Sequence, residues 1–117
     1  MIEHLTLETF KDKIMDFETN KDFKGDLPTI LDFSADSWCQ PCKQLSPILE
    51  ELSEEYKGKI NIYKIDVEME QELSSAFDIR SVPTILFYSL DGEQKISRGF
   101  LPKSRLKSNI KEILKIE

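Results

Sequence analysis

The chain has 117 residues, enough for one domain of modest size and too few for two, and its 39% hydrophobic content supports a real core. Its 22 acidic and 16 basic residues give a formal net charge of −6, which argues against nucleic acid as a main partner because phosphate binding needs a basic face. No apolar run approaches the ~20 residues that span a bilayer and residues 1–5 do not resemble a secretory signal, so we expect a cytoplasmic protein without membrane contacts.

Apolar spacing in the first half of the chain predicts a helix, a strand, a longer helix and a second strand. In chain order these are a helix with the inner stripe Phe10, Ile14 and Phe17, a loop over 20–26, a strand over 29–33, a helix over 41–56 and a strand over 60–65. The run at 29–33 is mostly apolar, which is typical of a strand that is buried on both faces.

The second half predicts a short helix, a pair of strands and a last helix. These are a helix with Leu73, Ala76 and Phe77 facing inward, strands over 84–88 and 94–98, and a helix with Pro102 in its first turn. A short Asp91-Gly92 loop joins the two strands, which makes them an antiparallel hairpin. The order predicts a single α/β domain over 1–117, with a mixed central sheet and helices on both faces.

The two cysteines lie two residues apart in Trp38-Cys39-Gln40-Pro41-Cys42. Sulfurs at this spacing can close a small disulfide ring or open to a dithiol with little backbone movement. If the motif opens a helix, unpaired backbone N–H groups favour the thiolate of Cys39. The spacing alone also fits half of a zinc site or a pair of inert buried thiols. A zinc site needs four ligands, and only His4 and scattered carboxylates remain, so we expect no metal.

With this motif between a strand and a helix, the chain resembles the thioredoxin family. The likeness covers nearly all of the chain from about Leu31 onward, in the family's order, through Leu31-Asp32-Phe33-Ser34-Ala35, Pro47, Lys64-Ile65-Asp66, Ile79-Arg80-Ser81-Val82-Pro83-Thr84 and Gly99. Gln40 departs from the pattern, because thioredoxins usually have glycine there. The stretch from Asp32 to Trp38 is one residue longer than usual, through Asp36-Ser37, and we expect the extra residue to bulge out before Trp38.

The resemblance implies a role for each polar residue of the motif. Cys39 would attack a client disulfide, and Cys42 would then displace the client's sulfur and close the Cys39–Cys42 disulfide. Asp32 would accept the proton of Cys42, since burial raises the pKa of a carboxyl group. Lys64 would place a positive charge near Asp32. The alternatives are a solvent-exposed Asp at a strand end and an ordinary surface lysine.

The resemblance also implies a surface for client proteins. Pro83 would follow a cis peptide bond, which composition alone does not predict because only ~5% of X-Pro bonds in folded proteins are cis. Val82 would then offer its backbone to an extended client strand. A shallow, partly apolar platform around the exposed sulfur of Cys39 would consist of Trp38, Pro41, Val82, Pro83 and Gly99. For Trp38, plain core packing is the alternative.

These observations favour a thioredoxin-like protein-disulfide reductase that acts as a monomer on disulfide-containing client proteins. No nucleotide or flavin motif is present, so no cofactor is expected and a separate reductase of the thioredoxin-reductase type would supply electrons. The alternatives are a disulfide oxidase or isomerase of an exported compartment and a non-catalytic interaction module. An oxidising potential is typically favoured by a hydrogen-bond donor that stabilises the thiolate state, and Pro41 supplies no such donor, which favours the reductant. A non-catalytic module would need neither cysteine.

Overall fold

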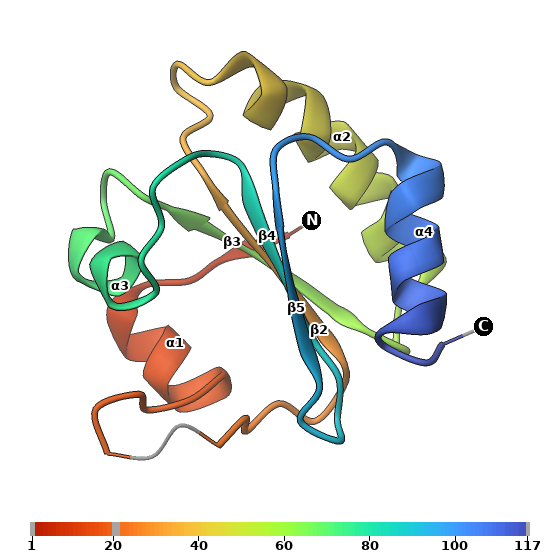
Figure 1. Ribbon diagram of the computed structural model, residues 1–117, viewed down its shortest axis with the longest axis horizontal. Helices are drawn as coiled ribbons and strands as arrows, with labels where there is room; N and C mark the ends of the chain where they lie inside the picture. The colour runs from red at the N-terminus through yellow and green to blue at the C-terminus, as the bar shows by residue number, and fades with distance from the viewer. Residues whose placement is uncertain (1, 20–21, 117) are drawn as a thin grey trace.

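The computed structural model of the protein describes residues 2–19 and 22–116. Its elements are β1 (Glu3–His4), α1 (Leu7–Lys13), β2 (Thr29–Ser34), α2 (Gln40–Glu55), β3 (Asn61–Asp66), α3 (Gln71–Ala76), β4 (Thr84–Tyr88), β5 (Gln94–Arg98) and α4 (Lys103–Glu112) (Figure 1). The predicted order of helices and strands is confirmed, and β1 is added to it. Part of the predicted loop, residues 20–21, lies outside the described residues.

The strands form one five-stranded sheet in the order β1-β3-β2-β4-β5. Strand β3 pairs in parallel with β1 and β2, while β4 pairs antiparallel with β2 and β5. The mixed sheet and the β4–β5 hairpin are therefore as predicted. Every residue of the central strand β2 is buried, because it has a strand on either side and helices over both faces.

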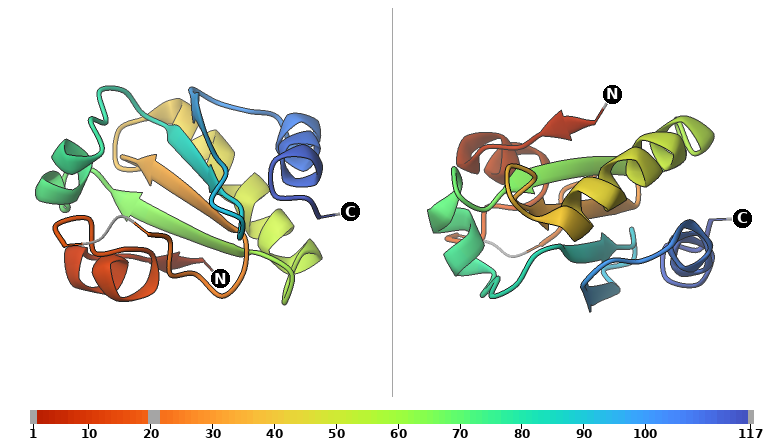
Figure 2. Two further views of the ribbon diagram at one scale, coloured as in Figure 1. Left: turned by 60° about the horizontal axis from the view of Figure 1, so that its bottom comes forward. Right: turned by 90° about the horizontal axis from the view of Figure 1, so that it is seen from above.

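Helices α2 and α4 cover one face of the sheet, and α1 and α3 cover the other (Figures 1 and 2). Successive side chains of a strand point to opposite faces. Accordingly, Ile30 of β2 packs in the core beneath α2 and α4, whereas Leu31 and Phe33 pack in the core beside α1 and α3. The same alternation places Asp32 on the face of Ile30, beneath α2. No helix among the described residues is long and apolar enough to cross a membrane.

Three helical predictions need correction. Helix α1 ends at Lys13, so Phe17 lies beyond it, although its ring still contacts those of Phe10 and Phe77 at centroid distances of 6.1 and 5.8 Å. Pro102 is the residue before α4 and not a member of its first turn. Ala76 is exposed at the end of α3. Apolar spacing thus identified Phe17 as a residue that packs against the core, where it is half-buried, but assigned it the wrong local backbone.

Candidate active site

Helix α2 begins at the cysteine motif. Cys39 is the residue before the first helical turn, and its sulfur accepts a hydrogen bond from the backbone N–H of Cys42 at 3.2 Å. Pro41 lies in the first turn, where its missing N–H would have had no partner within the helix. The N-terminus of α2 therefore directs backbone donors and the positive end of its dipole at the sulfur of Cys39.

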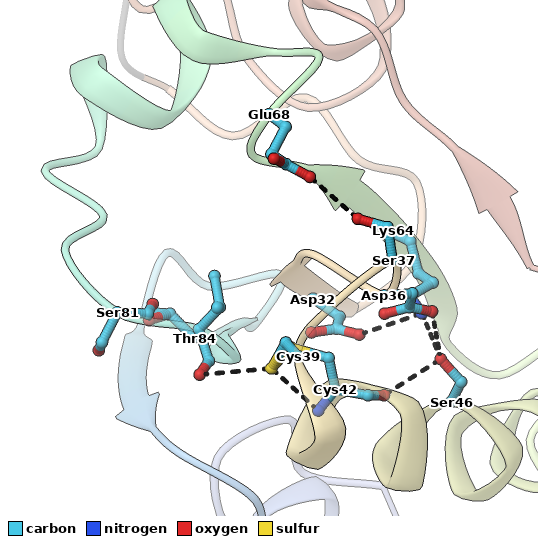
Figure 3. Close-up of a disulfide and its surroundings, with 11 residues drawn as sticks. Asp32, Asp36, Ser37, Cys39, Cys42, Ser46, Lys64, Glu68, Ser81 and Thr84 are labelled. Carbon is cyan, nitrogen blue, oxygen red and sulfur yellow. Dashed lines mark hydrogen bonds and ion pairs between the residues drawn. A yellow bond between two sulfur atoms is a disulfide. The ribbon is translucent and has the colours of Figure 1, made fainter.

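The two sulfurs are bonded to each other (Figure 3). Cys42 is fully buried, and Cys39 is only 4% exposed, so its sulfur is more enclosed than expected. The pair packs against Ala35, Val67 and Val82, and the sulfur of Cys39 lies 3.7 Å from the carbonyl oxygen of Val82. Cys39 is thus the sulfur nearer to solvent. Across the described part of the chain, no three His, Cys, Asp or Glu side chains gather as they would around a metal ion.

Asp32 lies in the middle of β2, fully buried, opposite Lys64 of β3 and Ile85 of β4. Neither carboxylate oxygen has a hydrogen-bond partner among the described residues. Burial raises the pKa of Asp32 to about 7. The positive charge of Lys64 acts in the opposite direction and lowers this pKa, whereas the negative charge of Asp36 raises it. Asp32 is therefore a carboxyl group that can exchange a proton near neutral pH. The alternative of a solvent-exposed Asp at a strand end is wrong.

Lys64 lies beneath α2 and is 5% exposed, so it is not an ordinary surface lysine. Its ammonium is 3.9 Å from a carboxylate oxygen of Asp32, too far for a hydrogen bond. It donates hydrogen bonds instead to the carboxylate of Asp36 and the hydroxyl of Ser46 (Figure 3). Ser46 in turn donates to Asp36 at 2.8 Å. We call these three residues the Asp36–Ser46–Lys64 network.

The extra residue between Asp32 and Trp38 is taken up by a turn. The backbone N–H groups of Trp38 and Cys39 both donate to the carbonyl oxygen of Ala35, at 3.2 and 2.9 Å. Ser37 is exposed and donates to Glu68 at 3.0 Å, as the dashed line in Figure 3 marks. Residues 36–38 therefore form a turn before Cys39. The longer turn was visible in the sequence, but its contact with Lys64 was not.

The predicted platform is only partly assembled into one surface. Trp38 is 60% exposed and lines a shallow pocket of about 330 Å³ together with Val67, Ile79, Arg80, Ser81 and Val82. Trp38 is therefore not a core residue, and Val82 lies beside it as predicted. Pro41, Pro83 and Gly99 do not line this pocket. Sequence reasoning did not predict that Val67 and Ile79 line this pocket. Val67 directly follows β3 and Ile79 belongs to the loop before Pro83, and both segments lie beside the cysteine motif in the fold.

Pro83 and Gly99 lie next to each other, and Pro83 directly follows Val82 of the pocket. The Val82–Pro83 bond is cis, as predicted. The N–H of Gly99 donates to the carbonyl oxygen of Pro83 at 2.8 Å, and Gly99 has a φ of 95°, a left-handed conformation that favours glycine. The family resemblance therefore correctly placed Gly99 beside the loop that contains Pro83.

Comparison with known proteins agrees with this geometry. The family model described as Thioredoxin matches residues 1–112. A thioredoxin of Borreliella burgdorferi is 47% identical over 110 residues, with 92% of this chain and 93% of that protein covered. A thioredoxin of Rickettsia felis is 38% identical over 107 residues, covering 91% and 92% respectively. Among solved structures, chloroplastic thioredoxin z superposes with a TM-score of 0.78 at 29% identity, covering 93% of this chain and 90% of that one.

The redox chemistry expected from the sulfur pair and the relationship to these proteins lead to the same conclusion. Thioredoxins are protein-disulfide oxidoreductases that exchange electrons with client proteins and with a reductase. This chain belongs to the thioredoxin family, and its activity is thiol–disulfide exchange through Cys39 and Cys42.

Proposed function

We propose that Cys39 is the nucleophile that attacks client disulfides and that Cys42 resolves the resulting mixed disulfide. The observation that carries this assignment is the asymmetry of the two sulfurs. Cys39 lies nearer to solvent at the N-terminus of α2, with the N–H of Cys42 directed at its sulfur, whereas Cys42 is fully buried. A thiolate is stabilised at the first position and would be desolvated at the second. The two sulfurs therefore differ in the way that an attacking and a resolving thiol require.

The reaction proceeds in two exchanges. In the dithiol form, the Cys39 thiolate attacks one sulfur of the client disulfide; a Cys39–client disulfide forms and the client's second sulfur leaves as a thiolate, which takes up a proton. Cys42 then loses its proton and attacks the sulfur of Cys39, which closes the Cys39–Cys42 disulfide and releases the client's first sulfur. The client gains two electrons and two protons, and the cysteine pair is oxidised. A reductase returns the pair to the dithiol.

Asp32 is the proposed acceptor of the Cys42 proton. It lies beneath the start of α2, its pKa is about 7, and none of the described residues donates a hydrogen bond to its carboxylate. A base whose pKa is near the working pH is the most efficient kind. Lys64, 3.9 Å away, would stabilise the carboxylate before it takes the proton. In Figure 3 the Asp32 carboxylate points into the space between the disulfide and Lys64.

Client segments would bind across the pocket beside the disulfide. The apolar part of the pocket comes from Trp38, Val67, Ile79 and Val82, and Pro41, Pro83 and Gly99 would extend the surface around it. A shallow, exposed apolar patch with few polar groups is suited to weak binding of many different client proteins. Because both sulfurs, the proposed base and the pocket come from one chain, we propose that the protein acts as a single-domain monomer.

The direction of electron flow is the second part of the proposal. We infer a reductant, because Pro41 supplies no hydrogen-bond donor that would stabilise the thiolate state and so favour an oxidising potential. We propose the cytoplasm as its place of action, since disulfide reductants belong in a compartment that keeps thiols reduced. Equilibration with glutathione measures this directly. The expected reduction potential is that of the family, about −270 mV, a value taken from thioredoxins generally and not from this chain. A potential above about −180 mV would instead identify an isomerase or oxidase.

Cys42→Ser is expected to trap clients as stable mixed disulfides on Cys39. The attack by Cys39 survives, but no second sulfur is present to displace the client. Incubation of the reduced variant with oxidised insulin, followed by non-reducing electrophoresis and mass spectrometry, should show a dithiothreitol-sensitive adduct at Cys39. The Cys39→Ser, Cys42→Ser double variant is the matched control and should form none. An adduct that is equally abundant on Cys39→Ser alone would reverse the assignment of the two sulfurs.

A further inference from the structure

Lys64 has two acidic neighbours, and it is hydrogen-bonded to only one of them. Its ammonium donates to Asp36 and to Ser46 but lies 3.9 Å from Asp32. Asp32 is the more deeply buried of the two carboxylates, so in isolation it has the greater need of a donor. The ammonium of Lys64 is nevertheless hydrogen-bonded to the half-buried Asp36, and the carboxylate of Asp32 has no hydrogen-bond partner among the described residues.

The turn between β2 and α2 explains this arrangement. Trp38 and Cys39 both bond back to Ala35, which folds residue 36 over the end of β2 toward β3. Ser46, one turn after Cys42 on α2, completes the ring by donating to Asp36 while it accepts from Lys64. The hydroxyl of Ser46 also lies 3.3 Å from the carbonyl oxygen of Cys42. The Asp36–Ser46–Lys64 network thus ties the motif turn, the first part of α2 and β3 together.

The charges on either side of Asp32 follow from this geometry. On β3 it is opposite Lys64, the turn brings Asp36 near it, and on β4 it is opposite the apolar Ile85. Asp36 acts on Asp32 in two ways that have the same sign. It neutralises part of the Lys64 charge and holds the ammonium beyond hydrogen-bonding distance, and it adds a second negative charge nearby. Both effects make ionisation of Asp32 harder.

We propose that Asp36 is a positioning residue that holds Lys64 on Ser46 and away from Asp32, so that Asp32 retains the proton affinity needed to deprotonate Cys42. The proposal deepens the function given above and rests on the role of Asp32 proposed there. Hydrogen bonds within the network support it: burial would raise the pKa of Asp36, but donation from Lys64 and Ser46 holds it below the usual value. Asp36 is therefore the ionised member of the pair, and Asp32 the one that titrates near neutrality.

Asp36→Ala tests the proposal by direct observation of Asp32. In the oxidised protein neither cysteine titrates, so the carboxyl ¹³C resonance of Asp32 can be followed against pH without interference. Loss of Asp36 frees Lys64 to bond Asp32, and the titration midpoint of Asp32 is expected to move down by about one pH unit. Ser37→Ala is the matched control, because it changes the same turn but lies outside the network, and its midpoint should equal that of the wild type. An unchanged midpoint in Asp36→Ala would overturn the proposal.

A double-mutant cycle separates positioning from simple repulsion. In a Lys64→Met background, Asp36→Ala can act on Asp32 only through the lost negative charge, which is half-exposed and screened by water. The downward shift caused by Asp36→Ala is therefore expected to be less than half as large in that background. Equal shifts in both backgrounds would overturn positioning. Ser46→Ala removes the other partner of Lys64 and should move the midpoint in the same direction as Asp36→Ala, by a smaller amount.

The same variants distinguish this inference from the role of Asp32 itself. If the titration midpoint moves but the pH profile of mixed-disulfide resolution does not, Asp36 positions Lys64 as inferred and Asp32 is not the base for Cys42. If both move together, both statements are supported. The resolution rate is measured by stopped-flow from a preformed Cys39 adduct, so that the first exchange does not contribute.

Discussion

Cys39→Ser is expected to reduce the rate of insulin disulfide reduction at neutral pH to that of the uncatalysed reaction, a loss on the order of a thousand-fold or more. A serine hydroxyl is not ionised at neutral pH and cannot form the disulfide on which both exchanges depend. Nothing else in the pocket changes, because the side chain at position 39 is small and nearly buried. The measurement is the onset of insulin precipitation with dithiothreitol as the terminal reductant.

The control for this experiment is the reduced wild type, which also lacks the disulfide. The thermal midpoints of the variant and the reduced wild type should agree, so that loss of activity is not loss of fold. Unchanged turnover in Cys39→Ser would show that the reduction occurs elsewhere. A wild type that binds oxidised clients but never reduces them would identify the non-catalytic interaction module instead.

Asp32→Asn is expected to make the protein more stable at pH 8 and to change its stability little at pH 4. The pKa of Asp32 is about 7 in the folded protein and 3.8 is its ordinary value, so the folded state binds the proton more tightly than the unfolded state does. The stability from this proton is fully present below about pH 4 and is lost as pH rises to about 7. At about 1.4 kcal/mol per pH unit, the contribution of Asp32 to the stability of the wild type should fall by about 4 kcal/mol over that interval.

Asparagine carries no ionisable group, so this part of the pH dependence should disappear from the variant. Denaturant unfolding of the oxidised protein between pH 4 and pH 8 measures it, because the cysteines do not titrate in that form. Asp12→Asn, an exposed position on α1, is the matched control and should leave the pH dependence as in the wild type. The same pH dependence in the wild type and in Asp32→Asn would show that Asp32 does not hold its proton near neutral pH in the folded state.

The two predictions concern different steps of one reaction. Cys39 supplies the attack, and Asp32 supplies the proton acceptor for the resolving sulfur. Asp32 is a buried carboxyl group at a position where we expect an amide of the same shape to be more stable at pH 8. Such a cost at a buried site is common where a perturbed pKa is needed for function.

Much of the fold was predictable because its signals are local. Residues 29–33 and 84–88 are short apolar runs, and both are fully buried strands. Asp91-Gly92 marked the hairpin, and Pro41 marked the start of α2. Phe17 shows the limit of this reasoning. Its spacing from Phe10 matched a helix, but it lies beyond α1 and its ring contacts those of Phe10 and Phe77 from there.

The sequence alone pointed to the chemistry of the protein, since Cys39 and Cys42 lie on either side of Gln40-Pro41, at the start of a predicted helix. It also indicated Asp32 and Lys64, whose neighbouring strands place them opposite each other. Only the tertiary structure decided which carboxylate Lys64 bonds, and that Val67 and Ile79 share a pocket with Trp38. The reason is physical. A helix start or a buried strand depends on residues close in the chain, whereas the partner of a buried cation depends on strand register, on the path of a turn and on one hydroxyl of a packed helix.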